Sequence, residues 1–322
     1  MLKGARILVT GGAGFIASNL ILRLKEEQAV VRATIHDKPI QISANGIEVV
    51  KVDLRELRAC REVVDDVDYV FHCAANTSGA AVMAETPLVH VTPNVVMNTH
   101  LLEASYEAGI KKFIFISSGA AYPSTGERPV GEEEMFNDEP EDIYYPVAWM
   151  KRYAEILCRT YATKINSPMS TLVVRPSNIY GPYDKFDFAT SHVTAALVRR
   201  VVERQNPMEI WGTGNDIRDL IFISDFIEGL LLAVNRCDFY DEINLCSGVG
   251  FTIKEILKAA LRLEHFESAD IKFNSNKPST VHVRRLDNSK AKEKLCFEPS
   301  VGLDEGLTHV IDWYKANPFI PG

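Results

Sequence analysis

The sequence predicts an α/β fold, with a doubly wound parallel sheet and a smaller α/β lobe beside it. The first half of the chain alternates short apolar runs with amphipathic stretches, which is typical of repeated strand–helix units. The first apolar run, at residues 7–9, leads directly into glycines and then into a helical pattern. After about residue 178 the alternation is lost, which indicates a second lobe over the carboxyl ends of the strands.

Six segments carry the apolar and β-branched composition of strands, and they are residues 6–10, 30–35, 48–52, 69–73, 112–117 and 170–175. A helix is predicted over 94–108 because Gly109 stands where a helix ends in left-handed geometry. Thr252 and Glu255 form a capping box that opens a later helix, and 303–316 is a final helix. The acidic segment 124–142 contains Pro and Gly and is predicted as a surface loop.

Two units follow from this pattern, and a length of 322 residues is enough for both. The first unit is expected to comprise residues 1–177 together with about 217–240. The second is expected to comprise 178–216 together with about 241–322.

Composition narrows the possible partners and the compartment. The net charge of −8 argues against a broad basic surface for nucleic acid. The six cysteines are scattered without metal-ligand spacing, so we expect reduced thiols and no metal site. No apolar run has the length of a membrane helix, and the N-terminus does not read as a signal peptide. These features predict a cytoplasmic protein with no membrane partner.

The glycine-rich turn after the first strand predicts a dinucleotide site of the Rossmann type. A tight glycine turn lets a pyrophosphate approach backbone amides at the start of a helix, where the dipole favours an anion. The residues expected to contact the cofactor here are Gly11, Ala13, Gly14, Phe15 and Ile16.

The end of the second strand is expected to contact the adenosine ribose, where an acid favours NAD and basic groups favour NADP. At this end of the strand, His36 and Lys38 favour NADP and Asp37 favours NAD, and together they give a slight preference for NADP. Asp53 and Leu54 follow the third strand and are expected at the adenine, although Asp53 also suits a helix cap.

Several motifs together resemble the extended short-chain dehydrogenase/reductase family, in particular its epimerases, dehydratases and reductases of nucleotide-linked sugars. They are residues 10–16 (TGGAGFI), 53–54 (DL), 72–75 (HCAA), 116–118 (ISS), 175–182 (RPSNIYGP), 218–225 (RDLIFISD) and 285–290 (RLDNSK). Residues 181–185 and 191–193 are most similar to the GDP-sugar members, such as the GDP-fucose synthases and GDP-mannose 3,5-epimerases.

The resemblance implies hydride transfer at a sugar carbon, usually C4, with a Tyr as acid or base. It implies that Ser118 positions the sugar oxygen and that Lys151 lowers the pKa of that Tyr and holds the nicotinamide ribose. It also implies further cofactor contacts at Cys73, Ala74, Ala75, Ser117, Pro176, Asn178 and Ile179. The position of the Tyr, four residues before Lys151, is occupied by Val147, which cannot exchange a proton.

Three hypotheses account for Val147. The first moves the phenol to Tyr144 or Tyr145, although six residues separate Tyr145 from Lys151 and place the two on different faces of a regular helix. In the second, the proton travels through Ser118 and water, or through Tyr183 or His192. In the third, the site binds cofactor and ligand without normal turnover.

Two departures from the family narrow the reaction. Its 4,6-dehydratases carry an Asp–Glu pair directly after the Ser, where this chain has Gly119 and Ala120. Its 3,5-epimerases use a Cys near position 120, which alanine cannot replace. Simple oxidation, reduction or epimerisation at C4 is what remains.

On the substrate side, the resemblance implies that Asn178 and Arg218 hold the diphosphate, joined by Arg285 or its neighbour Arg284. Other expected substrate contacts are Thr77, Ser78, Ser118, Lys185, His192, Val193 and Trp211. The resemblance also implies a homodimer that pairs the helices holding 94–108 and 151–161. An NAD(P)-dependent GDP-sugar enzyme is the main hypothesis, and a protein that binds cofactor and nucleotide sugar with little catalysis is the alternative.

Overall fold

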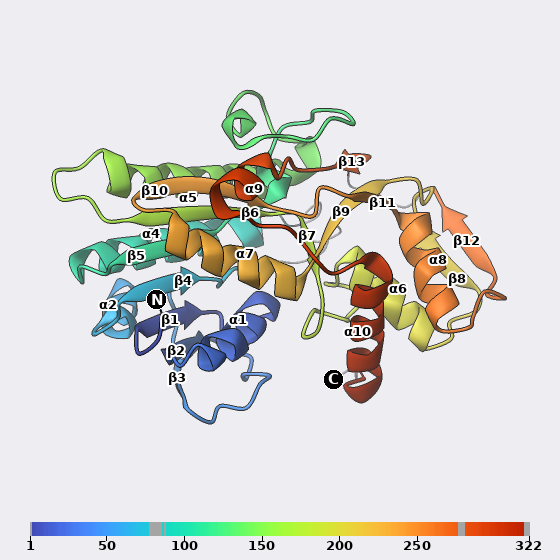
Figure 1. The fold of residues 1–322 in the computed structure, drawn as a ribbon, viewed down its shortest axis with the longest axis horizontal. Helices are drawn as coiled ribbons and strands as arrows, with labels where there is room; N and C mark the ends of the chain where they lie inside the picture. The colour runs from blue at the N-terminus through green and yellow to red at the C-terminus, as the bar shows by residue number, and fades with distance from the viewer. Residues whose placement is uncertain (1, 77–85, 87, 276–280, 319–322) are drawn as a thin grey trace.

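A seven-stranded parallel sheet forms the centre of the larger lobe (Figure 1). The computed structural model describes residues 2–76, 86, 88–275 and 281–318. In spatial order the strands are β10 (Tyr240–Leu245), β6 (Thr171–Pro176), β5 (Lys112–Ile116), β4 (Tyr69–His72), β1 (Arg6–Thr10), β2 (Val30–Ile35) and β3 (Ile47–Lys51). From β1 the chain adds β2 and β3 on one side, and from β4 it adds β5, β6 and β10 on the other. In such sheets ligands bind at the carboxyl ends of the two strands where the direction reverses, which here are β1 and β4.

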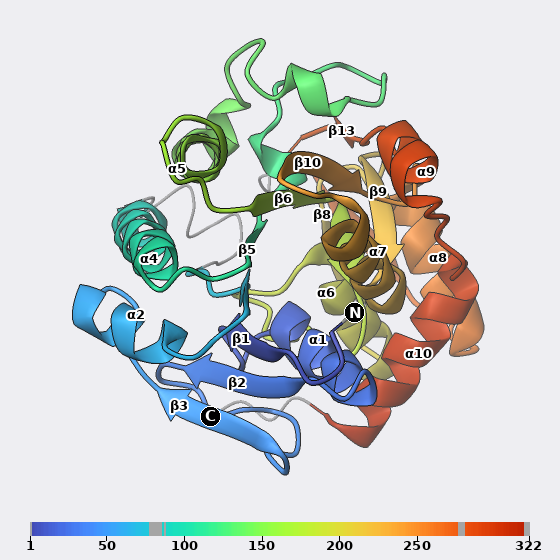
Figure 2. The ribbon, with the colours of Figure 1, turned by 60° about the vertical axis from the view of Figure 1, so that its left-hand side comes forward.

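Helices cover both faces of this sheet (Figure 2). On one face lie α2 (Leu57–Val64), α4 (Leu88–Glu107) and α5 (Tyr145–Thr163), and on the other lie α1 (Phe15–Glu26) and α7 (Ile223–Arg236). All five residues of β5 and all six of β6 are buried, as expected for parallel strands covered on both faces.

The smaller lobe is built around a second sheet at the side of the first (Figure 1). In this sheet β9 (Ile217–Phe222) pairs with β7 (Asn178–Tyr180), β11 (Gly250–Thr252) and β13 (Val283–Arg284). Two further strands, β8 (Met208–Trp211) and β12 (Ile271–Asn274), pair in parallel. The remaining helices are α6 (Val193–Val202), α8 (Ile253–Leu263), α9 (Ser289–Leu295) and α10 (Leu303–Ala316), with short 3₁₀ turns η1 (Gly119–Ala121), η2 (Glu132–Glu134) and η3 (Asp142–Tyr144).

The predicted fold class and the six predicted strands are confirmed, each strand within one residue at either end. Helix α10 has the predicted bounds, and the capping box of α8 is present, since Thr252 Oγ1 accepts from Glu255 N at 3.1 Å and Glu255 Oε2 accepts from Thr252 N at 2.7 Å. The structure assigns β9 to the second sheet and β10 to the first, whereas the sequence expectation gave 217–240 to the first unit and 241 onwards to the second.

Helix α4 begins at Leu88, before the predicted start at residue 94, and contains Pro93. A proline inside a helix leaves one carbonyl without its usual N–H donor. Here Asn76 Nδ2 donates to the carbonyl oxygen of Val89 at 2.8 Å, so the helix passes through the proline with that acceptor satisfied.

The predicted loop 124–142 is tied to the body of the protein. Val130 forms a bridge with Leu286, and the buried Glu132 accepts a hydrogen bond from the backbone N of Asn244 at 2.7 Å. None of the described helices has the length and hydropathy needed to cross a membrane.

Candidate functional site

The glycine turn lies at the carboxyl end of β1 and leads into α1. Gly11 has φ +70°, and a Cβ there would come within 2.8 Å of the Cα of Ala74. Gly14 caps α1 without a side chain, so nothing covers the first amides of that helix from the cap position. Phe15 and Ile16 pack against the main core, and Gln41 Nε2 donates to the carbonyl of Ala13 at 2.8 Å. The turn therefore has the close approach and the helix N-terminus that a dinucleotide pyrophosphate requires.

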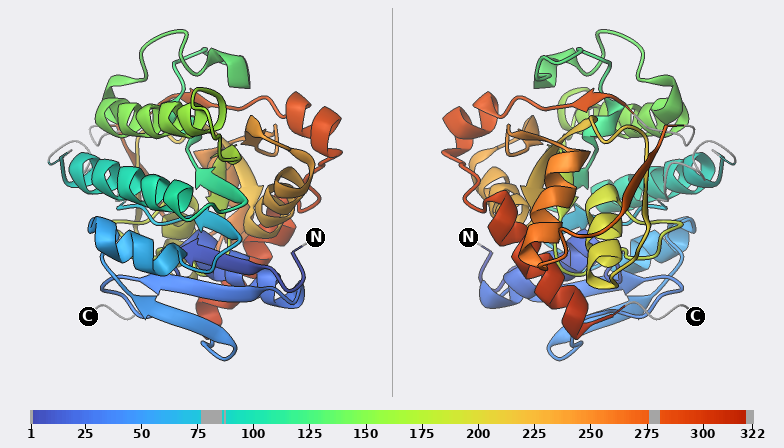
Figure 3. Two further views of the ribbon diagram at one scale, coloured as in Figure 1. Left: turned by 90° about the vertical axis from the view of Figure 1, so that its left-hand side faces the viewer. Right: turned by 90° about the vertical axis from the view of Figure 1, so that its right-hand side faces the viewer.

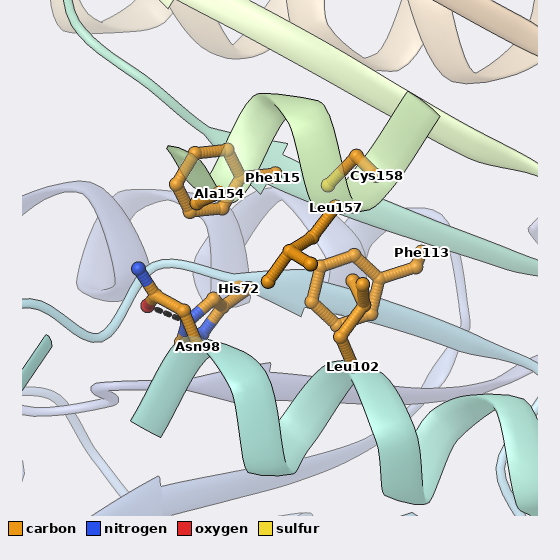
Figure 4. Close-up of a pocket in the computed structure, with 8 residues that line it drawn as sticks. All are labelled: His72, Asn98, Leu102, Phe113, Phe115, Ala154, Leu157 and Cys158. Carbon is orange, nitrogen blue, oxygen red and sulfur yellow. Dashed lines mark hydrogen bonds between the residues drawn. The ribbon is translucent and has the colours of Figure 1, made fainter. Parts of the chain in front are cut away.

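The loop after β4 is fixed against this turn by a buried histidine. The ring nitrogens of His72 hydrogen bond with Thr10 Oγ1 and with Asn98 Oδ1, each at 2.8 Å. Figure 4 shows the second of these bonds. Burial lowers the pKa of His72 to about 4, so the ring is neutral. Thr10 Oγ1 also accepts from Ala74 N at 3.0 Å, which places the expected cofactor residues Cys73, Ala74 and Ala75 beside Gly11.

Figure 4 shows a small hollow behind His72, between α4, α5 and the sheet. It is too small for a water molecule, and apart from His72 and Asn98 its lining is apolar or a thiol. It is a gap in the packing beneath the sheet and not a ligand site.

Charged side chains gather where β2 and β3 end, at the residues expected to contact the adenosine. Arg55 Nη2 lies 2.5 Å from Asp53 Oδ2, and this hydrogen bond lowers the pKa of Asp53 to about 2. His36 Nε2 is 3.7 Å from the same carboxylate, and His36 Nδ1 is 2.9 Å from Asp37 Oδ2. Both acids are therefore engaged by bases of the chain.

Two lysines from distant parts of the chain meet at the same end. Lys38 follows β2 and is exposed, whereas Lys185 comes from the loop after β7. Burial and the nearby charge of Lys38 lower the pKa of Lys185. Lys185, expected at the sugar, thus lies near Lys38. Leu54 packs its side chain into the core beneath α2.

Lys151 lies buried on α5, with Val147 one turn before it. Its Nζ donates to the carbonyl oxygen of Ile116 at 2.8 Å. Burial lowers the pKa of Lys151 to about 8, while Glu155 and Cys73 act in the opposite direction. Of the residues expected at the nicotinamide, Lys151 and Cys73 are therefore close to each other.

The two serines after β5 have different surroundings. Ser118 Oγ accepts from Ala120 N at 3.1 Å and so caps the short turn η1. Ser117, expected at the cofactor, donates its hydroxyl to the buried carboxylate of Glu155, which Arg175 Nη2 holds at 2.7 Å. A side chain at Gly119 has no room, because a Cβ would come within 2.9 Å of the carbonyl of Pro176.

The tyrosines considered as replacements for the missing phenol are spread around the site. Tyr145 is 47% exposed and lies edge-on to Trp149 on the outer face of α5. The ring of Tyr183 packs against Trp313, with centroids 5.1 Å apart. Tyr144 faces Arg284, whose guanidinium carbon is 6.0 Å from its ring centroid.

His192 precedes α6 and pairs with a buried acid. Its Nδ1 is 3.2 Å from Asp184 Oδ1, and the charge of Asp184 raises the pKa of His192. The Asp184 side chain is 2% exposed, whereas that of His192 is 58% exposed. Sequence reasoning missed Asp184, because no periodicity links an acid in a loop to a histidine eight residues later. Val193 is the first residue of α6.

Two arginines stand side by side in the second sheet. Arg284 on β13 pairs in register with Arg218 on β9, and both are more than nine-tenths buried. Burial lowers the pKa of each. Arg285 instead donates to the carbonyl of Gly248 at 3.2 Å. The arginine that accompanies Arg218 is thus Arg284.

The other expected residues come from β6, β7 and β8. Pro176 ends β6, while Asn178 and Ile179 are half-buried on β7. Trp211 ends β8 and is 44% exposed. Thr77 and Ser78 lie outside the described residues.

Comparison with known proteins gives consistent matches along the chain. The model of the NAD dependent epimerase/dehydratase family matches residues 7–246. GDP-mannose 3,5-epimerase of Arabidopsis thaliana is 30% identical over 321 residues, which covers 97% of this chain and 83% of that protein. GDP-L-fucose synthase of Sinorhizobium fredii is 28% identical over 324 residues and covers 98% of both. The crystal structure of UDP-glucose 4-epimerase from Thermotoga maritima, with UDP-glucose, has a TM-score of 0.87 and 27% identity, covering 97% of this chain and 99% of that one.

Proposed function

The chain belongs to the NAD-dependent epimerase/dehydratase family, and from that premise we propose that it oxidises, reduces or epimerises a GDP-sugar at C4. The observation that carries the proposal is the arrangement around the carboxyl edge of the sheet. The glycine turn and buried Lys151 belong to the large lobe, and the paired arginines Arg218 and Arg284 belong to the small one. The relatives named for GDP-sugars support guanine as the base.

The large lobe is proposed to hold the cofactor. The turn at Gly11 and Gly14 fits a pyrophosphate, since any Cβ at Gly11 would collide with Ala74. The hydrogen bond from Lys151 Nζ to the carbonyl oxygen of Ile116 fixes the ammonium near the end of β5 and supports a role in holding the nicotinamide ribose. The nicotinamide, when bound, supplies the hydride acceptor or donor, and the protein supplies the site.

We propose NADP as the preferred cofactor. Burial, followed by the charge of Lys38, lowers the pKa of Lys185, and two cationic side chains that repel each other in this way favour an anion nearby. Asp53 is paired with Arg55 and Asp37 with His36, so the negative charge that each acid would present to a bound cofactor is partly offset. A 2′-phosphate suits this surrounding better than a 2′-hydroxyl.

His192 is the proposed acid or base in place of the phenol. Tyr145 faces outward, Tyr183 packs on Trp313 and Tyr144 faces Arg284, which leaves His192 and Ser118 of the groups considered. A histidine titrates near neutral pH, and the carboxylate of Asp184 both orients the ring and favours its protonated form. Ser118 is then the hydrogen-bond partner of the sugar oxygen.

We also propose a homodimer through α4 and α5, which lie side by side on the outer face (Figure 3). The exposed side chains along α5 include Tyr145, Trp149, Tyr153 and Ile156, at helical spacing on one face. Leu88 and Val89 at the start of α4 are exposed as well. Apolar side chains gathered in this way are typical of a protein interface.

The second candidate function is binding of cofactor and nucleotide sugar with little or no turnover, and Val147 favours it. The test incubates the purified protein with each cofactor and with GDP-, UDP- and dTDP-sugars, and follows absorbance of the reduced nicotinamide and the sugar products. A change with a GDP-sugar alone supports the enzyme. Binding of both ligands with no change in either supports the second candidate.

Val147→Tyr tests whether the missing phenol limits the rate. A positioned acid or base contributes about 100-fold or more. If no group replaces the phenol, as in the second candidate, Val147→Tyr is expected to raise turnover by about that factor; with His192 in that role, it is expected to leave turnover nearly unchanged. Val147→Phe is the matched control, because it adds the ring without the hydroxyl. Equal activity of Val147→Tyr and Val147→Phe would contradict a role for the absent phenol.

A further inference from the structure

Tyr144 has no part in the proposed proton transfer, yet its surroundings are those of a ligand site. It ends the turn η3 directly before α5 and packs against the cluster that contains Tyr122, Ala148 and Leu286. Arg284 lies over its ring. Burial lowers the pKa of both Arg218 and Arg284, and Tyr144 in its ionised form acts on both in the opposite direction.

The guanidinium of Arg284 is only partly satisfied by the protein. Its Nη1 donates to the carbonyl oxygens of Tyr122 at 3.3 Å and Pro123 at 3.4 Å. Its Nε and Nη2 are buried, and within the described part of the chain they have no hydrogen-bond partner. Those two nitrogens form one edge of the guanidinium, where their N–H groups run parallel and match two oxygens of a phosphate.

The position of this edge is set by the sheet. Arg284 and Arg218 are register partners on parallel strands, so their side chains leave the sheet on the same face. Arg218 already has Asp216 at 3.9 Å, but the Nε and Nη2 edge of Arg284 has no such partner among the described residues, so the two buried cations favour a further anion nearby. The phenol of Tyr144 adds a hydroxyl to this group, and among the described residues none hydrogen bonds with it.

We propose that Tyr144 is a binding residue for the diphosphate of the nucleotide sugar, with its hydroxyl donating to a phosphate oxygen held by Arg284 and Arg218. The aromatic ring supports the guanidinium of Arg284 from one side, which leaves the Nε and Nη2 edge for the ligand. This inference rests on the proposed function, since it takes a nucleoside diphosphate as the ligand of the arginine pair.

The test is isothermal titration of GDP into the full chain and into Tyr144→Phe, which keeps the ring and removes the hydroxyl. A hydrogen bond to a charged group is expected to weaken GDP binding about tenfold when it is lost. Tyr161→Phe is the matched control, because it makes the same change on α5 against Tyr106, away from the arginines. NADP affinity is expected to stay unchanged in both variants, and it also reports that they are folded.

Three outcomes of the GDP titration test the proposed role of Tyr144. Weaker GDP binding in Tyr144→Phe alone, with NADP binding retained, supports the inference. Equal GDP binding in Tyr144→Phe and the parent overturns it and leaves the proposed function standing. A parent chain that binds neither GDP nor UDP overturns the proposed function, and the inference with it.

Discussion

Lys151 is a buried ammonium whose pKa of about 8 is well below the ordinary value of 10.5. Below about pH 8 the folded and unfolded chains both keep this proton, and the folded chain bears the cost of a buried charge. Between about pH 8 and the ordinary value, the folded chain loses the proton while the unfolded chain retains it. Stability contributed by this group therefore rises with pH across that window.

Removing the ammonium should abolish this dependence. Between about pH 7 and about pH 9.5, the parent is expected to gain about 2 kcal/mol of unfolding free energy relative to Lys151→Met. Urea unfolding of the cofactor-free proteins at the two pH values measures the difference. Lys164→Met removes an exposed ammonium at the end of the same helix and should show no such gain. If the difference in unfolding free energy between the parent and Lys151→Met were the same at both pH values, burial would not shift the pKa of Lys151.

At the residue scale, the sequence predicts the surroundings of a side chain only where its neighbours in space are also close to it in the chain. The glycine turn, Ser118 and Lys151 follow local patterns, and Cys73 is among the groups that act electrostatically on Lys151. The pairing of His192 with Asp184 and the choice of Arg284 over Arg285 depend on a loop and on strand register. Neither has a periodic signal in the sequence.

At the scale of elements, α5 has two faces with different tasks. Lys151 and Glu155 lie inward, and Tyr145, Tyr153 and Ile156 lie outward. Ile156→Glu is expected to convert the proposed dimer to a monomer, because a charge in an apolar interface loses its hydration without a partner. Light scattering after size exclusion measures the mass.

Phe239→Glu provides the control for this change, since it places the same charge at an equally exposed apolar residue beside β10. That variant should keep the mass of the parent. A dimer that persists in Ile156→Glu would rule out this face of α5 as the interface.

Elements also show where the sequence pattern is insufficient. The six predicted strands are recovered because each is a short apolar run bounded by turns. The start of α4 is not predicted correctly. Asn76 donates to the carbonyl that Pro93 leaves without an N–H donor, and no local sequence pattern contains this contact between two segments. The division between lobes likewise depends on β9 and β10 pairing with strands far away in the chain.

At the scale of the whole molecule, the protein carries a net charge of −8, but a local group of basic side chains lies at the proposed adenosine site. In the proposed site the 2′-phosphate of NADP would be attracted by His36, Lys38 and Lys185 at short range, and salt screens such attraction near the surface. NADP affinity is therefore expected to fall severalfold more than NAD affinity between about 50 mM and about 300 mM salt. Fluorescence titration of both cofactors measures this.

Lys38→Gln removes one of these charges and is expected to reduce the extra salt dependence of NADP while leaving that of NAD alone. Equal salt dependence of NADP and NAD in the parent would argue against a 2′-phosphate site.

The bridge between Val130 and Leu286, together with the contacts of Arg284 to Tyr122 and Pro123, joins the middle of the chain to its last third. During synthesis on a ribosome, the strands around the glycine turn emerge long before β13. A nascent chain that has reached β10 can complete the large sheet and its cofactor turn, while the loop at 124–142 still lacks its partner strand. In the order of synthesis, the proposed cofactor site is therefore complete before the proposed sugar-nucleotide site.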